Sequence, residues 1–363
     1  MIYRVIGLMS GSSLDGIDIV FTELEERAGK WVFEIIAADC VPYGHEWFEK
    51  LQQATRLNAY EYLLLHAAYG KFTGEIVNKF IDKHDLHHKV QLIASHGHTV
   101  FHKPSLGMTA QLGDGATIAA TTGINVVSDL RAMDVALGGQ GAPIVPVGEK
   151  LLLPEYGYYL NLGGIANISA NISDQYIAFD ICPANRVLNM LAAKEGKEYD
   201  NGGSMAQSGL LNTALLTQLN NQSYYTQAYP KSLANNFGTD ILFPLIEVSG
   251  LPAIDALRTY TEHIVQQIVH AVNSLQIAAS KQQMLVTGGG AFNNFLIKRL
   301  KESLNVFNIE VIVPDENLVK YKEALIMALL GVLRWREEDT VMQSVTGASR
   351  NSIGGAVWIG QEA

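Results

Sequence analysis

The sequence predicts an α/β protein built from two domains. Apolar runs of strand length alternate with segments of helical periodicity, which is the pattern of α/β proteins. Two glycine-containing strand–turn–strand segments, at 5–21 and 159–169, lie about one domain apart and indicate two similar halves. The length of 363 residues suits two hydrophobic cores better than one.

In the first half, the predicted strands alternate with helices that return to a sheet. Strands are expected in the first hairpin and at 31–39, 91–94 and 125–129, and helices at 45–56 and 59–83. The glycine-rich, non-periodic stretch 131–146 marks the first domain boundary. We therefore expect one domain at 1–130 together with about 345–363, and a second domain at 131–344.

The second half repeats this pattern after its own hairpin. We expect strands at 176–180, 284–287 and 309–313, and helices at 185–194, 253–275, 293–304 and 323–335. The helix at 253–275 carries apolar residues on one face, as a helix against a sheet does. Residues 199–209 are predicted to form a polar, glycine-rich loop.

The composition excludes several classes of function. A net charge of −10 argues against a nucleic-acid partner and against an anionic membrane surface. The two cysteines are far apart and lack metal-ligand spacing, so neither a disulfide framework nor a zinc site is indicated. The amino terminus enters a strand directly, without a signal-peptide pattern, and we expect a cytoplasmic protein. The sequence does not decide between a monomer and a homodimer.

The turn of the first hairpin has the composition of a phosphate site. Gly11, Ser12 and Ser13 allow close backbone approach and offer amide and hydroxyl donors to phosphate oxygens. Asp15 or Asp18 is then placed to face a magnesium ion on that phosphate. The alternative is a plain hairpin, because Asp-Gly is itself a strong turn signal.

The triple glycine at 288–290 follows a predicted strand and precedes a helix, which also indicates nucleotide contact. A dinucleotide-binding turn is the alternative, with Asp315 about where a ribose-binding acid would stand. The third glycine of that fingerprint is missing, since Asn293 occupies its place.

Two further segments carry polar groups at strand ends. His96, His98 and His102 lie within eight positions, which raises a metal site, but hydrogen bonding to a polar substrate is favoured because no carboxylate or cysteine completes a ligand set. Asp180 closes a strand at the edge where α/β proteins place working groups. Its alternative role is to cap the helix that follows.

Several motifs together resemble one family. Residues 9–18, Met-Ser-Gly-Ser-Ser-Leu-Asp-Gly-Ile-Asp, are similar to Met-Ser-Gly-Thr-Ser-x-Asp-Gly-x-Asp, the first motif of the anhydro-N-acetylmuramic acid kinases. Further similar stretches follow in the expected order, among them 128–134, 138–143, the Pro-Lys-Ser at 230–232 and 288–293, and they extend from residue 5 to residue 350. These kinases belong to the actin, hexokinase and heat-shock-protein-70 ATPase superfamily. The resemblance thus implies a two-domain actin-like ATPase (ribonuclease-H-like) fold with a nucleotide cleft between the domains.

The resemblance also implies roles for particular residues. Asp180 would be the general base, and ATP with Mg²⁺ the cofactors, with Asp15 as the metal ligand. Sugar contacts are implied for His96, Asp129, Arg131 and Asn185. The implied nucleotide contacts are Gly11, Ser12, Ser13, Leu14, Asp15, Gly16, Ile17, Asp18, Gly163, Gly164, Gly288, Gly289 and Gly290.

The chain departs from the family pattern at several places. Ser12 replaces Thr, Asn189 replaces Asp, and Leu233-Ala234 replaces the Thr-Gly that follows Pro-Lys-Ser. His98 stands where the family has Gln in Ser-His-Gly-Gln-Thr. Ile181, Cys182 and Ala184 replace Thr, Gly and Gly in Phe-Asp-Thr-Gly-Pro-Gly-Asn, and these changes bear on which sugar is bound.

The resemblance implies an ATP-dependent kinase that opens 1,6-anhydro-N-acetylmuramic acid with water and phosphorylates O6, in peptidoglycan recycling. Two other hypotheses are a kinase for a different amino sugar and a nucleotide-binding regulator without turnover. A panel of anhydro and ordinary amino sugars with Mg-ATP distinguishes the three.

Overall fold

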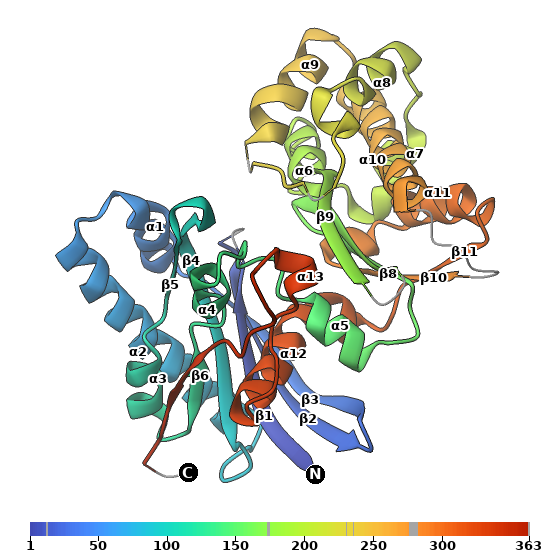
Figure 1. Ribbon diagram of the computed structural model, residues 1–363. Helices are drawn as coiled ribbons and strands as arrows, with labels where there is room; N and C mark the ends of the chain where they lie inside the picture. Colours follow the sequence, from blue (N-terminus) through green and yellow to red (C-terminus); the bar gives the residue numbers. More distant parts are fainter. Residues whose placement is uncertain (12–13, 173–174, 230, 235, 276–281, 362–363) are drawn as a thin grey trace. The chain divides into compact units, whose positions relative to one another are not determined.

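The computed structural model describes residues 1–11, 14–172, 175–229, 231–234, 236–275 and 282–361 (Figure 1). The chain forms two compact units. Unit 1 comprises Met1–Pro154 and Tyr321–Ala363, and unit 2 comprises Glu155–Lys320. Each unit has its own sheet with helices packed on it, so the predicted α/β class is confirmed. Within the described ranges, no helix is long and apolar enough to cross a membrane.

Unit 1 is built on one mixed sheet. Its strands are β1 (Ile2–Ser10), β2 (Gly16–Arg27), β3 (Lys30–Pro42), β4 (Leu92–Lys103), β5 (Met108–Leu112), β6 (Val126–Ser128) and β12 (Ala356–Trp358). Its helical segments are α1 (His45–Gln53), η1 (Ala54–Arg56), α2 (Ala59–Lys83), η2 (Pro104–Leu106), α3 (Gly115–Thr122), α4 (Ala132–Ala136), α5 (Pro146–Leu152), α13 (Gln343–Thr346) and most of α12 (Glu316–Trp335).

The sheet of unit 1 is covered on both faces. Its order is β12-β6-β4-β1-β2-β3, with β1 antiparallel to β2 and parallel to β4. Ile6 and Leu8 point to the face covered by α2 and share its core cluster. Gly7 points to the other face, where a Cβ would lie 2.0 Å from the carbonyl oxygen of Ala324. Because side chains alternate across a strand, this glycine lets α12 pack directly on β1.

Unit 2 has a smaller sheet. Its strands are β7 (Tyr158–Leu162), β8 (Ile165–Ile172), β9 (Gln175–Pro183), β10 (Gln282–Thr287) and β11 (Ile309–Ile312). Its helical segments are α6 (Asn185–Ala193), η3 (Asn201–Gly203), α7 (Ser204–Ser208), α8 (Thr213–Asn220), η4 (Ser223–Thr226), η5 (Gly238–Leu242), α9 (Phe243–Val248), α10 (Ala253–Leu275), η6 (Gly289–Phe292) and α11 (Asn294–Asn305).

The two sheets share one topology. In unit 2 the order is β11-β10-β7-β8-β9, in which an antiparallel meander of three strands is extended by two parallel strands. The order β6-β4-β1-β2-β3 in unit 1 is the same when its strands are counted from β1. Each first strand therefore turns into an antiparallel partner through a hairpin, and the predicted two similar halves of ribonuclease-H-like type are confirmed.

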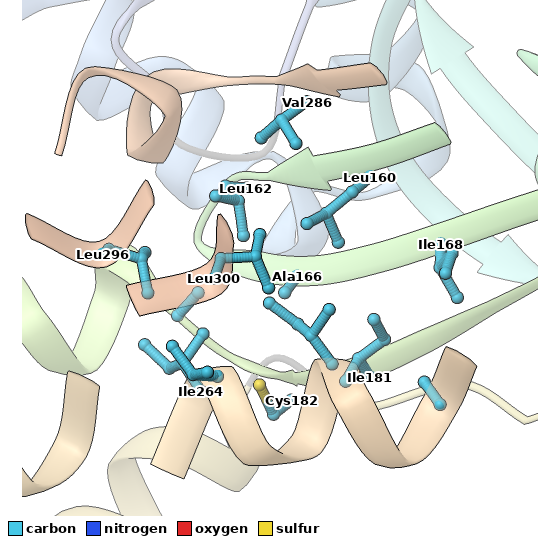
Figure 2. Packing of buried hydrophobic residues seen from close by; sticks show 14 of the residues in the cluster. Leu160, Leu162, Ala166, Ile168, Ile181, Cys182, Ile264, Val286, Leu296 and Leu300 are labelled. Atoms are coloured by element: carbon cyan, nitrogen blue, oxygen red, sulfur yellow. The ribbon is translucent and has the colours of Figure 1, made fainter. Parts of the chain in front are cut away.

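The core of unit 2 lies between its sheet and its helices. Figure 2 shows Leu160 and Ile168 on strands of the sheet, and Ile264 on α10 and Leu300 on α11, all within one hydrophobic cluster. Ile264 is fully buried, because the apolar face of α10 lies against the sheet. Burial of a side chain of this size contributes about 1.5–3 kcal/mol. This packing holds the strand ends, and the groups on them, in fixed positions.

The compact units divide the chain at 154/155 and 320/321, whereas the sequence placed the divisions at 130/131 and 344/345. Residues 131–154 remain with unit 1, where the side chain of Asp134 accepts a hydrogen bond from Thr346 at 2.7 Å. Most of α12 also belongs to unit 1, because Gly331 packs against Ala94 of β4. The glycine-rich stretch is thus an internal turn of unit 1.

Other elements differ in detail from the prediction. Helix α12 begins at Glu316 instead of 323, and Asp315 accepts hydrogen bonds from Asn317 N and Leu318 N at its start. Strand β4 continues from the predicted 91–94 to Lys103, with Gly97 at φ 72° where its register shifts. Residues 199–209, predicted to be a loop, contain η3 and α7.

Candidate active site

The first turn lies between β1 and β2 of unit 1. Ser12 and Ser13, two of its predicted phosphate contacts, lie outside the described residues. Leu14 has the left-handed φ of 59°, which is uncommon for a residue with a side chain and occurs often at functional turns. Asp15 is exposed, and its Oδ1 accepts a hydrogen bond from Gly16 N at 3.0 Å. The side chain of Asp15 is therefore exposed, while the backbone of the turn holds one of its carboxylate oxygens.

Acidic groups gather behind this turn. Burial raises the pKa of Asp18 to about 6, and the negative charges of Asp15 and Glu323 add to this increase. Burial also raises the pKa of Glu323. The side chain of Ile17 is in the core of unit 1, so only its backbone is left for the predicted nucleotide contact.

His96 and Arg131 form a pair in unit 1. Arg131 Nε donates to His96 Nε2 at 2.8 Å, and His96 Nδ1–H donates to the carbonyl of Gly97 at 2.9 Å. Burial lowers the pKa of His96 to about 3, and the nearby Arg131 charge acts in the same direction. Both ring nitrogens are therefore engaged, and His96 holds Arg131 in position. The direct sugar contact of His96 stays a prediction.

Arg131 is a partly exposed cation whose other bonds fix its position. Its Nη1 donates to the carbonyl of Gly141, and Gly141 N donates to Asp134 Oδ2 at 2.7 Å. Burial lowers the pKa of Arg131 to about 10, which keeps it charged at neutral pH. Nearby, Asp129 is exposed at the end of β6 with a φ of 56°. Backbone conformations of this kind are uncommon away from functional sites.

In unit 2, two glycine turns come together. Asn185 N donates to the carbonyl of Gly163 at 3.1 Å, and Asn185 Nδ2 donates to the carbonyl of Leu162 at 2.9 Å. A Cβ on Gly290 would lie 3.0 Å from Asn185 Oδ1, and Gly288 has a φ of 81°. The predicted residues at 163–164, 185 and 288–290 are thus neighbours, although 103 residues separate Gly288 from Asn185 in sequence.

Asp180 is held at one carboxylate oxygen. Leu233 N donates to Asp180 Oδ2 at 2.8 Å, and Tyr224 Oη donates to the carbonyl oxygen of Asp180 at 2.6 Å. Asp180 N in turn donates to the carbonyl of Lys231 at 3.2 Å. Burial raises the pKa of Asp180. No hydrogen bond from the described residues reaches Oδ1, so this oxygen is available to take a proton.

Sequence reasoning did not find Tyr224 or Leu233 as partners of Asp180. Both lie more than 40 residues further along the chain, at positions without charge or glycine. The similarity of 230–232 to Pro-Lys-Ser was the only signal that this segment matters.

A β-bulge sets the direction of Asp180. Asn167 pairs with Asp180 while Ala166 pairs with Cys182, so Ile181 is the extra residue. Bulges re-aim side chains and are frequent beside active sites. Here the bulge lets Ile181 and Cys182 both enter the core of unit 2 (Figure 2) while Asp180 stays partly exposed.

The departures at Ile181, Cys182 and Ala184 are therefore core substitutions. Their side chains are 2%, 0% and 0% exposed, respectively. Their side chains pack in the hydrophobic core of unit 2, and their effect on which sugar is bound stays a prediction.

Three alternative interpretations given in the sequence analysis, for Asp180, for Asp315 and for the histidines, disagree with the structure. Ala184 occupies the N-cap of α6, and Asp180 stands inside β9, so Asp180 is not a helix cap. Asp315 accepts a hydrogen bond from Leu318 N at the start of α12, so it caps that helix and belongs to no dinucleotide site. In addition, the strands β7 and β8 of unit 2 pair antiparallel, unlike the parallel strands of a dinucleotide-binding fold. No group of three or more His, Cys, Asp or Glu among the described residues could hold a metal, which removes the histidine metal site.

The fold and these groups define a class of protein. Two units of one topology, each with a glycine-bearing hairpin turn after its first strand, make this a two-domain α/β protein of the actin-like ATPase fold.

The sequence matches the family model for anhydro-N-acetylmuramic acid kinase over residues 3–360. Anhydro-N-acetylmuramic acid kinase of Shewanella denitrificans is 33% identical, covering 96% of both chains, and that of Haemophilus influenzae is 32% identical, covering 97% of both. Among solved structures, the activator of the 2-hydroxyisocaproyl-CoA dehydratase from Clostridium difficile has a TM-score of 0.47 at 14% identity, covering 92% of this chain and 96% of its own. The chain belongs to the anhydro-N-acetylmuramic acid kinase family, and it is a sugar kinase.

Proposed function

We propose that this protein uses ATP and water to convert 1,6-anhydro-N-acetylmuramic acid into N-acetylmuramic acid 6-phosphate, as a step of peptidoglycan recycling in the cytoplasm. Water adds to C1, the bond between C1 and O6 breaks, and O6 attacks the γ-phosphorus while ADP leaves. The proton released by the water passes to a carboxylate. Family membership over nearly the whole chain supports this reaction.

Asp180 is the proposed general base. The observation that carries this role is its asymmetric binding: Leu233 N holds Oδ2 at 2.8 Å while Oδ1 accepts no bond from the described residues. Partial burial raises its pKa, which makes the carboxylate a better proton acceptor than an exposed aspartate. A positioned base of this kind contributes about a hundredfold to ten-thousandfold in rate.

Backbone donors at the glycine turns are the proposed phosphate contacts. A protein with a net charge of −10 has little general attraction for ATP, so local amide groups and a metal must supply it. When bound, Mg²⁺ would reduce the negative charge of the phosphates. Such an ion usually takes one or two carboxylates and several waters, which fits Asp15 with Asp18 behind it. Burial is the main cause of the raised pKa of Asp18, and the negative charges of Asp15 and Glu323, which add to it, are ones that a divalent cation would offset.

Arg131, Asp129 and Asn185 remain the proposed sugar contacts. Arg131 suits a carboxylate or a phosphate, since its guanidinium is charged and is fixed by His96. His96 acts in this proposal by positioning Arg131.

The test is turnover with Mg-ATP and a panel of sugars, followed by mass spectrometry of the product. The anhydro sugar should gain both a phosphate and a water, whereas open N-acetylmuramic acid should react poorly. Faster phosphorylation of another amino sugar would favour a different kinase. Binding of ATP without turnover on any sugar would favour a regulator.

A further inference from the structure

The carboxylate of Asp134 is fully buried in unit 1 and has no part in the proposed proton transfer. Its exposed fraction is 0%. Oδ2 accepts a hydrogen bond from Gly141 N at 2.7 Å, and Oδ1 accepts one from Thr346 Oγ1 at 2.7 Å. A buried charge is costly unless it is hydrogen-bonded, so these two bonds help to keep the carboxylate inside the unit.

The glycine-rich loop 138–141 is held between Asp134 and Thr346. Gly139 N donates to the carbonyl of Asp134 at 2.9 Å, and Gln140 N donates to the carbonyl of Thr346 at 2.9 Å. A Cβ on Gly139 would lie 2.3 Å from Asp134 Oδ2, so glycine is required for this close approach. Thr346 is on α13, 212 residues from Asp134 in sequence. We call Asp134, Thr346 and the loop 138–141 the clasp.

The clasp is bonded to the guanidinium of Arg131. Gly141 N is fixed by Asp134, and the carbonyl of the same glycine accepts from Arg131 Nη1. Arg131 Nε donates to His96 Nε2 at 2.8 Å. A guanidinium is planar, so acceptors at Nε and at Nη1 together set its orientation.

We propose that Asp134 and Thr346 are positioning residues, which clamp the loop so that the Gly141 carbonyl orients Arg131 toward the ligand. Neither residue touches the ligand itself. A guanidinium recognises a carboxylate in a planar, two-bond geometry, so its orientation affects affinity directly. The proposal rests on the proposed function in one respect, because the ligand is taken to be the sugar.

The first test observes the guanidinium and needs no substrate. In protein labelled with ¹⁵N-arginine, a guanidinium held by its bonds gives separate Nη1 and Nη2 signals, whereas free rotation averages them. The Arg131 signals are those that Arg131→Lys removes. We expect separate signals in the wild type and averaged signals in Thr346→Val, which keeps the shape of the side chain without its hydroxyl. Thr346→Ser restores the hydroxyl and should restore separate signals.

Thr73→Val is the matched control. Thr73 and Thr346 are both 2% exposed in unit 1, and the hydroxyl of Thr73 donates to the carbonyl of Tyr69 at 2.8 Å. Thermal unfolding measures how far each valine variant destabilises the protein. A merely structural effect would change the Arg131 signals in both variants, whereas positioning changes them in Thr346→Val alone.

Asp134→Asn separates the bonds of the clasp from its charge. The amide oxygen can accept from Gly141 N while the NH₂ group donates to Thr346 Oγ1, so the clasp is retained without the negative charge. We expect separate Arg131 signals in this variant. Averaged signals in Asp134→Asn together with separate signals in Thr346→Val would show that only the charge acts on Arg131, and would overturn the proposal.

Calorimetry tests the consequence for binding. Thr346→Val should bind 1,6-anhydro-N-acetylmuramic acid about three- to tenfold more weakly, the effect of one hydrogen bond, with unchanged affinity for Mg-ATP. In the Arg131→Lys background the same substitution should weaken binding by less than about twofold, because residues that act through one group are not additive. An equal loss in both backgrounds would show that Thr346 acts by another route, and would overturn the proposal.

The positioning role and the proposed function fail separately. Unchanged Arg131 signals in Thr346→Val would overturn the positioning role, whichever sugar is the substrate. A wild-type protein that turns over no sugar would refute the proposed function alone, because the arginine signals are measured without substrate.

Discussion

Lys322 and Glu149 form an ion pair inside unit 1, with 2.7 Å between Lys322 Nζ and Glu149 Oε1 and side chains only 4% and 3% exposed. Glu149 lies on α5 and Lys322 on α12, so the pair joins two helices that are 173 residues apart. Both residues are close to the points where the chain passes between the compact units, at 154/155 and 320/321. The pair thus fixes the unit 1 end of both connections.

Breaking this pair at one side should destabilise the protein. Lys322→Met leaves a carboxylate buried without its partner, so the free energy of unfolding should fall by about 3–5 kcal/mol in urea titrations. The double variant Lys322→Met with Glu149→Leu should recover much of this loss, because neither charge of the pair is left buried without the other. Lys320→Met removes the exposed pair with Glu316 and should change stability by less than about 1 kcal/mol. Equal effects of the two single lysine variants would contradict this expectation.

Asp180→Asn should separate catalysis from folding. The amide keeps the size of the side chain, and its oxygen can still accept from Leu233 N, but it cannot take a proton from water. Turnover should fall by about a hundredfold or more, with Mg-ATP affinity and unfolding temperature close to wild type. Asp240→Asn, at an exposed position of unit 2, is the control. Turnover near the wild-type value in a folded Asp180→Asn protein would rule out the base.

Asp15→Asn should weaken Mg-ATP without disturbing the fold. The side chain is exposed, and the asparagine keeps an oxygen that can accept from Gly16 N, so the turn should be retained. Calorimetry should show lower Mg-ATP affinity but little change for ATP measured without Mg²⁺, since the lost contact is to the metal. Asp82→Asn on an exposed helix end is the matched control. Identical Mg-ATP affinity in Asp15→Asn and wild type would remove Asp15 from the metal site.

Mg-ATP affinity should also depend on pH through Asp18. Its pKa is raised to about 6, so the group is largely protonated at pH 5 and ionised at pH 7. Affinity should therefore increase as pH rises through about 6, and Asp18→Asn should remove this increase. The raised pKa of Asp18 also lowers the free energy of unfolding as pH rises from about 4 to 6, because Asp18 loses its proton at a lower pH in the unfolded chain than in the folded one. An affinity that is independent of pH between 5 and 7 would show that Asp18 does not act on the metal.

Much of the fold was predictable because it depends on local signals. Helix α2 begins at Ala59 and ends at Lys83 as predicted, and its start is a capping box in which Asn58 and Glu61 bond to each other's backbone. Helix α10 also has its predicted bounds, since its apolar face is continuous. Such features are contained within one stretch of sequence.

The rest depended on contacts between distant residues. The pairing of His96 with Arg131, 35 residues away, places a histidine against a cation, and no local pattern in the sequence indicates this contact. The bulge at Ile181 decides that a bulky replacement enters the core, and it is visible only in the pairing of β8 with β9. Similarity to a family identified the motifs, but it did not show which side of a strand each side chain takes.

The last prediction concerns His263, which is fully buried in unit 2. Tyr225 Oη donates to its Nε2 at 3.0 Å, and its Nδ1–H donates to Asn220 Oδ1 at 2.6 Å, so the neutral ring has both nitrogens satisfied. Burial lowers its pKa to about 3, well below the value of 6.5 in the unfolded chain. Between these values the unfolded state binds the additional proton, so stability is lost as pH falls. The loss should begin near pH 6.5.

His263→Phe should remove this part of the acid sensitivity. In urea titrations from pH 7 to 4, the wild-type free energy of unfolding should fall by up to about 1.4 kcal/mol per pH unit because of this histidine alone. The variant should be less stable at pH 7, because Tyr225 and Asn220 lose a partner, but its stability should fall less steeply on acidification. His87→Phe, at an exposed site, should keep the wild-type slope. Since other acid-sensitive groups act alike in all three proteins, parallel curves for His263→Phe and wild type would show that His263 is not held neutral by the fold.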